Sequence, residues 1–189
     1  ADKTSNTEAK KIIHESISRV ESMYQIYTNL LPSEDYMEMS AKNYLENLIK
    51  SIIEIFPEKE KISAGMEIAD FKLNVKQLFS LGAIVNELIT NSVKYAFINR
   101  ESGLIVIMLK RNSHEIILSV HDDGEGLPVD FNVDKSTGFG LILVKMLSQQ
   151  LRGRFYMENN NGTRCIVTFK AELPVQSSPP ISPTEVKKH

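Results

Sequence analysis

Apolar residues recur at spacings of three and four in two segments near the amino terminus, the pattern of amphipathic helices. In residues 9–31 the stripe comprises Ile13, Ile17, Val20, Tyr24, Tyr27 and Leu31. In residues 41–56 it comprises Tyr44, Leu48, Ile52 and Ile55. The intervening LPSEDYMEMS is typical of a loop, with Ser40 as the N-cap of the second helix and Pro57 as its end.

From residue 60 onward the pattern changes to short strands alternating with helices. KISAGMEIAD (61–70) alternates loosely and predicts a strand, and residues 74–97 and 139–151 predict helices. Two β-hairpins are expected, one from 103–110 and 115–121, the other from RFYMEN and TRCIVTFKAEL around an NNG turn. This order predicts an α/β (α+β) fold, a two-layer sandwich of a mixed sheet covered on one face by helices.

Composition narrows the class of protein. The chain has 189 residues, 42% of them hydrophobic and 24% charged, and its net charge of −2 implies no general affinity for nucleic acid or anionic membranes. Cys165 is the only cysteine, which suits a reducing cytoplasm. No apolar run reaches the length of a membrane span. Because the chain starts at Ala1 without methionine, we expect a piece of a larger protein, which as a whole could be anchored in a membrane.

Polar residues form a stripe inside the third predicted helix, in NELITNSVKY (86–95). Glu87, Asn91 and Lys94 sit at positions i, i+4 and i+7 and share one helix face, whereas their neighbours are apolar. One interpretation is a solvated face with a Glu–Lys pair. The other is a site that needs a carboxylate, an amide and an ammonium in register.

Glycine-rich segments are the other candidates for chemistry. In HDDGEGLP (121–128), Gly124 and Gly126 would let the backbone approach a ligand, although a surface turn explains the same composition. In STGFGL (136–141), backbone amides before a helix would form an anion site, or Ser136 or Thr137 would simply cap that helix. NNGTR (160–164) alone indicates only a turn.

Several other motifs are absent from the sequence. It contains no G-x-x-x-x-G-K-[ST] phosphate loop and no complete G-x-G-x-x-G fingerprint after a strand. His14-Glu15 lacks the second histidine of a zinc-protease helix, and the four histidines have no metal-ligand spacing.

The order of these motifs resembles the ATP-binding fold shared by gyrase, the MutL mismatch-repair protein, heat-shock chaperone ATPases and sensor histidine kinases. LGAIVNELITNSVKYAF is similar to the N box, DDGEGLP to the first glycine box, STGFGLILVKML to the second, and NGTRCIVTF to the closing strand. Asp123 stands where the family frequently has asparagine. ESISRVESM (15–23) resembles the second helix of the second type of histidine kinase dimerisation domain, so the resemblance covers about residues 9–173.

This resemblance implies a role for each motif. Glu87 would orient or deprotonate the nucleophile, Asn91 would bind Mg²⁺ through its carbonyl oxygen, and Lys94 would reach a phosphate. Asp122 would accept from the exocyclic amine of adenine and so exclude guanine, with Thr163 near the same edge. Residues 129–137 would form a mobile lid over the phosphates. The remaining nucleotide-binding candidates are Tyr95 (equally compatible with the core), Gly124, Gly126, Gly138, Gly140 and Leu141.

The resemblance also predicts the organisation and partners of the chain. Residues 1–58 would be part of a dimerisation and phosphotransfer hairpin, 59–173 the ATP-binding domain and 174–189 a disordered tail rich in Pro and Ser. The expected function is transfer of the ATP γ-phosphate to a histidine of the same chain or of the partner chain in a homodimer. A response regulator receiver domain is the further expected partner. His14 matches the second hairpin helix, so the acceptor is expected upstream. The alternatives are an anti-sigma-factor-like serine kinase and a non-catalytic ATP-sensing dimerisation module.

Overall fold

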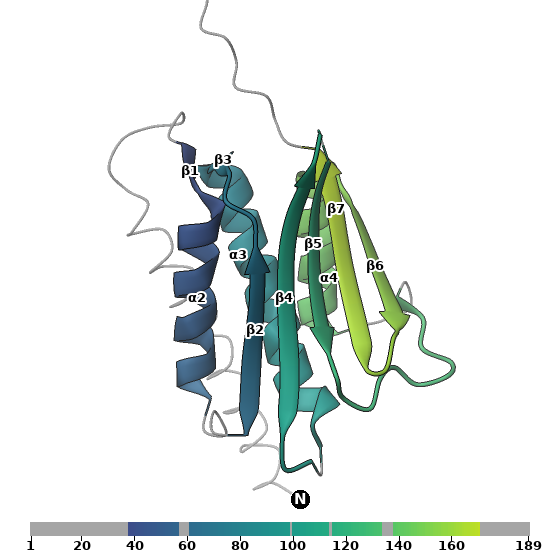
Figure 1. Cartoon of the computed structure of the whole chain (residues 1–189). Coiled ribbons are helices and arrows are strands. Elements are labelled where there is room, and N and C mark those ends of the chain that lie inside the picture. Colours follow the sequence, from purple (N-terminus) through teal and green to yellow (C-terminus); the bar gives the residue numbers. More distant parts are fainter. Residues whose placement is uncertain (1–37, 57–60, 99, 114, 134–137, 171–189) are drawn as a thin grey trace, which may run out of the picture.

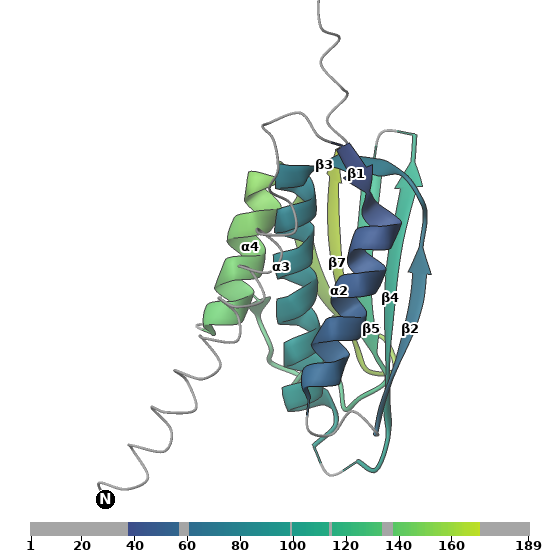
Figure 2. The same ribbon diagram turned by 90° about the vertical axis from the view of Figure 1, so that its left-hand side faces the viewer.

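Five strands form one mixed sheet, and three helices lie together on one of its faces (Figures 1 and 2). The computed structural model describes residues 38–56, 61–98, 100–113, 115–133 and 138–170. The predicted helix at 9–31, with His14, and the predicted disordered tail lie outside these residues. The predicted two-layer α/β sandwich is confirmed.

The sheet combines both predicted hairpins with one parallel strand. Its strand order is β2-β4-β5-β7-β6. The strands are β2 (Ile62–Ile68), β4 (Gly103–Asn112), β5 (Glu115–Asp122), β7 (Thr163–Lys170) and β6 (Arg154–Asn159). β2 runs parallel to β4, and the other neighbours are antiparallel. Pairing of β5 with β7 joins the two hairpins and places the end of β5 beside the start of β7.

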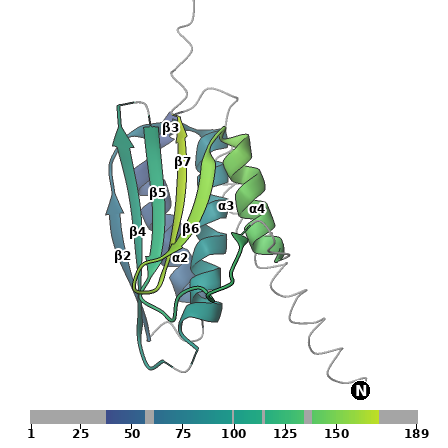
Figure 3. The same ribbon diagram turned by 90° about the vertical axis from the view of Figure 1, so that its right-hand side faces the viewer.

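The helical layer consists of α2 (Ala41–Ile55), α3 (Val75–Asn91) and α4 (Phe139–Gln150). α3 lies between the other two (Figures 2 and 3) and packs against both. Because α3 is covered by the sheet and by both neighbouring helices, most of its residues are buried, polar ones included. The helix predicted at 74–97 is α-helical only as far as Asn91, and its last turn is the π-helix η1 (Ser92–Ala96).

A small two-stranded ribbon precedes two of the helices and was not predicted. β1 (Glu38–Ser40) pairs antiparallel with β3 (Lys72–Asn74), so the prediction that the whole of 31–40 is a loop was wrong for its last three residues. Strands of three residues are too short to show an alternating pattern, and only their pairing creates them. Ser40 is the N-cap of α2, as predicted, and accepts from Asn43 N at 3.1 Å.

The buried face of α2 differs from the predicted stripe. Leu45, Ile49 and Ile52 are buried, whereas Ile55 at the end of the helix is 62% exposed. α2 contacts both α3 and β2, so the centre of its buried face lies between these two contacts. Tyr44 and Leu48, from the predicted stripe, flank that centre and are partly buried.

Tyr44 carries a buried hydroxyl into the contact between α2 and α3. It lies directly over Gly82, where any side chain would overlap it, and the described residues offer it no hydrogen-bond partner. Burial raises the pKa of Tyr44 above its usual value. A buried polar group without a partner costs stability, since it gave up water in the folded state.

Tyr44→Phe should therefore raise the free energy of unfolding by about 1 kcal/mol, measured by urea denaturation. Tyr95→Phe is the matched control, because the side chain of Tyr95 is 66% exposed and its hydroxyl reaches solvent. The control should change stability by less than about 0.5 kcal/mol. A clear loss of stability in Tyr44→Phe would mean that its hydroxyl has a partner.

Candidate nucleotide-binding site

The polar stripe of α3 lies at the interface with α4. Glu87 is fully buried at 0% exposure, and Asn91, one turn later, is half-buried. Gly140 of α4 faces both, since a Cβ atom there would lie 2.5 Å from Glu87 Oε2 and 3.7 Å from Asn91 Nδ2. The solvated-face interpretation of this stripe is therefore wrong for Glu87. Two of the predicted motifs, the N box and the second glycine box, meet at this point.

The π-helical turn η1 shapes the next part of the site. Within it, the carbonyl of Ala96 accepts from Glu125 N at 3.2 Å, which ties the loop after β5 to the end of the helix. Gly124 lies against the same residue, because a Cβ there would overlap the carbonyl and Cβ of Ala96. Single π-turns of this kind occur often at functional sites. This close approach to Ala96 requires glycine at 124, whereas the predicted approach of the backbone to a ligand there stays a prediction.

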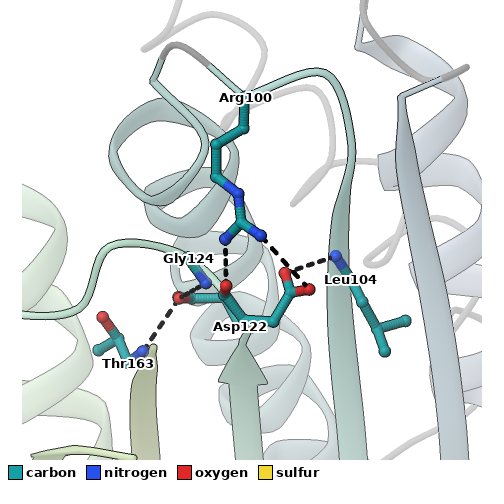
Figure 4. A network of polar contacts seen from close by, with 6 residues as sticks. Arg100, Leu104, Asp122, Gly124 and Thr163 are labelled. Atoms are coloured by element: carbon teal, nitrogen blue, oxygen red, sulfur yellow. Dashed lines mark hydrogen bonds and ion pairs between the residues drawn. The ribbon is translucent and has the colours of Figure 1, made fainter. Parts of the chain in front are cut away.

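Asp122 ends β5 with a buried carboxylate that accepts three hydrogen bonds. Its exposed fraction is 3%. Oδ1 accepts from the amides of Gly124 at 3.1 Å and Thr163 at 3.0 Å (Figure 4), and Oδ2 accepts from Ser92 Oγ at 2.9 Å. The structure thus brings Thr163 of the closing strand to Asp122 and Gly124 of the first glycine box, two motifs that are separate in the sequence. Ser92 was missed, since an isolated serine in a helix gives no signal.

Asp123 faces the opposite side and fixes the end of the strand. Its Oδ1 accepts from Leu104 N at 2.8 Å, and Arg100 pairs with its carboxylate at 3.9 Å and donates to its carbonyl. The two adjacent aspartates therefore differ in kind. Asp122 points into the protein, whereas Asp123 is exposed and closes the edge between β4 and β5.

The loop after Gly124 is held by a residue that the sequence did not reveal. Asn159, the last residue of β6, accepts from Leu127 N at 2.6 Å and donates to Leu127 O at 3.1 Å. The side-chain amide of Asn159 thus bonds both the N–H and the C=O of Leu127, as a neighbouring strand would, and fixes the first glycine box. Gly126, at φ +80°, lies against the same side chain. The sequence placed Asn159 at the end of the predicted strand RFYMEN, before the NNG turn, and gave no sign of a role for its side chain.

Gly162 is a third residue that sequence reasoning missed. Its φ of +121° is strained for any other residue, and a Cβ there would overlap the carbonyl of Asp122. The turn before β7 therefore packs directly on the buried aspartate. This contact positions Thr163, whose amide bonds Asp122.

The second glycine box begins α4 with no side-chain cap. Gly138 is the N-cap residue and has no side chain with which to cap the helix, and the predicted caps Ser136 and Thr137 lie outside the described residues. Gly140 is buried and Leu141 is half-buried. The anion site predicted at this N-terminus stays a prediction.

Two further candidates, Tyr95 and the lid, give mixed results. The side chain of Tyr95 is 66% exposed, so its interpretation as a core residue was wrong and contact with the nucleotide stays a prediction. Of the predicted lid 129–137, the structure describes 129–133, in which Phe131 is half-buried. Lys145 of α4 donates to the carbonyl of Val133, which holds this segment near the helix.

Cys165 lies on the buried side of β7, close to the candidate site. Burial and the nearby Asp122 carboxylate raise the pKa of its thiol to about 12. The thiol therefore stays protonated at neutral pH and is not a nucleophile.

Among the described residues, no three His, Cys, Asp or Glu side chains form a metal cluster. In the same part of the chain, no helix is long and apolar enough to cross a membrane.

Comparison with known proteins agrees with this geometry. Residues 78–175 match the family model of the histidine kinase-, DNA gyrase B-, and HSP90-like ATPases, and residues 1–56 match the HisKA_2 model, described as histidine kinase. The chain is 30% identical over 152 residues to sensor histidine kinase PdtaS of Mycolicibacterium smegmatis, covering 78% of this chain and 30% of that protein. It is 29% identical over 165 residues to PdtaS of Mycobacterium tuberculosis, covering 84% of this chain and 32% of that protein. It thus spans about a third of the length of these relatives.

Solved structures share the fold at low sequence identity. The histidine kinase domain of a blue-light-activated kinase from Erythrobacter litoralis superposes with a TM-score of 0.71 at 21% identity, covering 82% of this chain and 72% of that chain. The ATP binding domain of PrrB from Mycobacterium tuberculosis gives a TM-score of 0.61 at 18% identity, covering 74% of this chain and all of that one. The match at 1–56 also confirms the predicted type of dimerisation segment. The chain belongs to the family of histidine kinase-, DNA gyrase B- and HSP90-like ATPases, within which it is a histidine kinase catalytic domain.

Proposed function

We propose that this chain binds Mg-ATP and transfers its γ-phosphate to a histidine side chain, as the catalytic part of a sensor histidine kinase. The observation that carries the proposal is the fully buried carboxylate of Glu87 beside the glycine-capped N-terminus of α4. A carboxylate is costly to bury, so its presence there favours a chemical role over a packing role.

Asp122 would bind the base at the other end of the site. Its carboxylate accepts hydrogen bonds, and the exocyclic amine of adenine is a donor where guanine presents a carbonyl. Thr163 lies beside this carboxylate through its own amide, which supports a contact of its hydroxyl with the same edge of the base. Gly124 and Gly126 let the loop pass close under the nucleotide, and Tyr95 would cover it from the exposed side of η1.

The phosphates would lie between α3 and the N-terminus of α4. Gly138, Gly140 and Leu141 would offer backbone amides, which together with the helix dipole favour an anion. Lys94 would pair with a phosphate oxygen. Residues 129–137 would close over the phosphates as a lid, and the carbonyl of Val133 held by Lys145 marks its near end.

Mg²⁺ would be held by Asn91 together with phosphate oxygens and water. Its amide carbonyl is a neutral hard oxygen ligand, and Mg²⁺ commonly takes only one or two ligands from the protein. The ion would neutralise part of the triphosphate charge. Asn91 is half-buried one turn from Glu87, so a metal there would leave the Glu87 carboxylate for the nucleophile.

The chemical step would form a bond between an imidazole nitrogen and the γ-phosphorus. The bond from that phosphorus to the bridging oxygen breaks, ADP leaves, and Glu87 accepts the proton from the ring. We expect the acceptor histidine to lie upstream of the segment that includes His14, on the same or the partner chain of a homodimer. Phosphate would then pass to a response regulator receiver domain, in the cytoplasm.

Two alternatives receive less support. The histidine kinase match over 1–56 and the sensor kinase relatives do not favour the anti-sigma-factor-like serine kinase. A non-catalytic ATP-sensing module would not need a buried carboxylate at Glu87, so the burial of this side chain favours a kinase.

A two-part experiment tests the proposal. Mg-ATP at about 100 times its Kd should raise the stability of the chain by roughly 2.7 kcal/mol, whereas Mg-GTP at the same concentration should produce no comparable thermal shift. With radioactive γ-phosphate, the chain should label a separately supplied dimerisation hairpin, and the label should be lost in acid as for phosphohistidine. His14→Gln should label the hairpin equally well. Acid-stable label would indicate a serine kinase, and self-labelling that depends on His14 would place the acceptor in this chain.

A further inference from the structure

Among the described residues, one helical serine departs from the hydrogen bond that the other helical serines make. Ser51, Ser80 and Ser148 each donate to the carbonyl oxygen four residues earlier, at 3.1, 3.1 and 2.7 Å. This local bond is the usual choice of a helical serine. Ser92 instead donates across 30 positions of sequence to Asp122 Oδ2, at 2.9 Å. Ser51, Ser80 and Ser148 therefore serve as the comparison for the long-range bond of Ser92.

The π-turn accompanies this change of partner. Ser92 is the first residue of η1, and its amide bonds the carbonyls of both Ile89 and Leu88. Its hydroxyl donates to Asp122 Oδ2 at the end of β5. Ser92 and Asp122 are 7% and 3% exposed, so water has little access to this bond.

The two carboxylate oxygens of Asp122 have different kinds of hydrogen-bond donor. Oδ1 accepts from two backbone amides, which do not depend on any side chain. Oδ2 accepts from the Ser92 hydroxyl, the one side-chain donor that the structure gives it among the described residues. Each carboxylate oxygen accepts about two hydrogen bonds, so Oδ2 retains capacity for one more donor. The orientation of that remaining lone pair depends on Ser92.

We infer that Ser92 is a positioning residue for adenine recognition, which acts by fixing the carboxylate of Asp122 toward the exocyclic amine. This inference rests on the proposed function, and specifically on Asp122 as the adenine acceptor. Without the hydroxyl, Oδ2 loses its buried donor, and the carboxylate, then held only at Oδ1, can pivot about that oxygen so that Oδ2 turns away from the base. Ser92 itself needs no contact with the nucleotide.

Calorimetric titration with ADP in the absence of metal tests the inference. Ser92→Ala should weaken ADP binding about tenfold, as expected for a lost hydrogen bond to a charged group. Ser92→Thr keeps the hydroxyl and should restore affinity to within about threefold. Ser80→Ala is the matched control, since Ser80 lies in α3, which η1 continues, is 1% exposed and makes the local bond. It should bind ADP like the unchanged protein.

A double-mutant cycle separates positioning from general loosening of the site. In an Asp122→Asn background, Ser92→Ala should cost less than about twofold, because its effect passes through the carboxylate. An equal loss in both backgrounds would overturn the inference, as would unchanged ADP affinity in Ser92→Ala or an equal loss in Ser80→Ala. If the unchanged protein binds no ADP, the proposed function itself fails. If it binds ADP and Ser92→Ala binds equally well, only the inference about Ser92 fails.

Discussion

Glu87→Gln should lower phosphoryl transfer to the acceptor histidine at least about 100-fold, while Mg-ATP binds within about twofold of the unchanged affinity. Glutamine matches glutamate in shape, so the contact with Gly140 is kept. It cannot accept a proton, and a positioned general base contributes about 10²–10⁴-fold. Single-turnover labelling of the full kinase, with calorimetry on the same variant, measures both quantities.

A surface glutamate provides the control for this substitution. Glu46 lies on α2, where it pairs with Lys42 at 3.9 Å with its side chain 32% exposed. Glu46→Gln should leave transfer and binding unchanged, because exposed pairs of this kind contribute about 0.3–0.5 kcal/mol. Transfer by Glu87→Gln within about fivefold of the unchanged rate would exclude a role as base. A parallel loss of ATP binding would assign Glu87 to the structure of the site instead.

Asp122→Asn should weaken binding of adenine nucleotides by about 10- to 100-fold, with or without metal. The two backbone amides require an oxygen at the Oδ1 position, which places the new amide nitrogen at the Oδ2 position. There it presents donors to the amine of adenine, which is also a donor. The same nitrogen would suit the carbonyl of guanine, so discrimination against GDP should decrease as well. Titrations with ADP and GDP, with EDTA and with Mg²⁺, measure both effects.

Asp123→Asn is the matched control one residue away. Asp123 is exposed, and the bond that its Oδ1 accepts from Leu104 N is one that an asparagine oxygen also makes. Binding of ADP should stay within about twofold. If both variants lose affinity equally, the buried carboxylate has no special role. If the loss in Asp122→Asn appears only with Mg²⁺, Asp122 acts at the phosphates and not at the base.

Much of the fold was accessible from sequence because its signals are local. Alternation in 103–112 and 115–122 arises from strands with one buried face, so the pattern gave the hairpin within two residues of its observed ends. The helices of the catalytic domain were located by their apolar period for the same reason. The failures were short or broken elements. β1 and β3 have three residues each, and η1 begins inside a continuous helical pattern.

The residues of the candidate site also fall into those that local sequence patterns indicate and those that only the structure reveals. Glu87, Asn91, Asp122 and the glycines of both boxes lie in runs whose composition has no simple structural explanation, so the sequence by itself determined them as candidates. Ser92, Asn159 and Gly162 have ordinary composition, and their importance arises only from what lies opposite them. Ser92 meets Asp122 because α3 ends in a π-turn beside β5, and Gly162 meets it because β5 pairs with β7. Tertiary structure decided these contacts, since a hydrogen bond between residues 30 or more positions apart depends on packing and register, which no local pattern encodes.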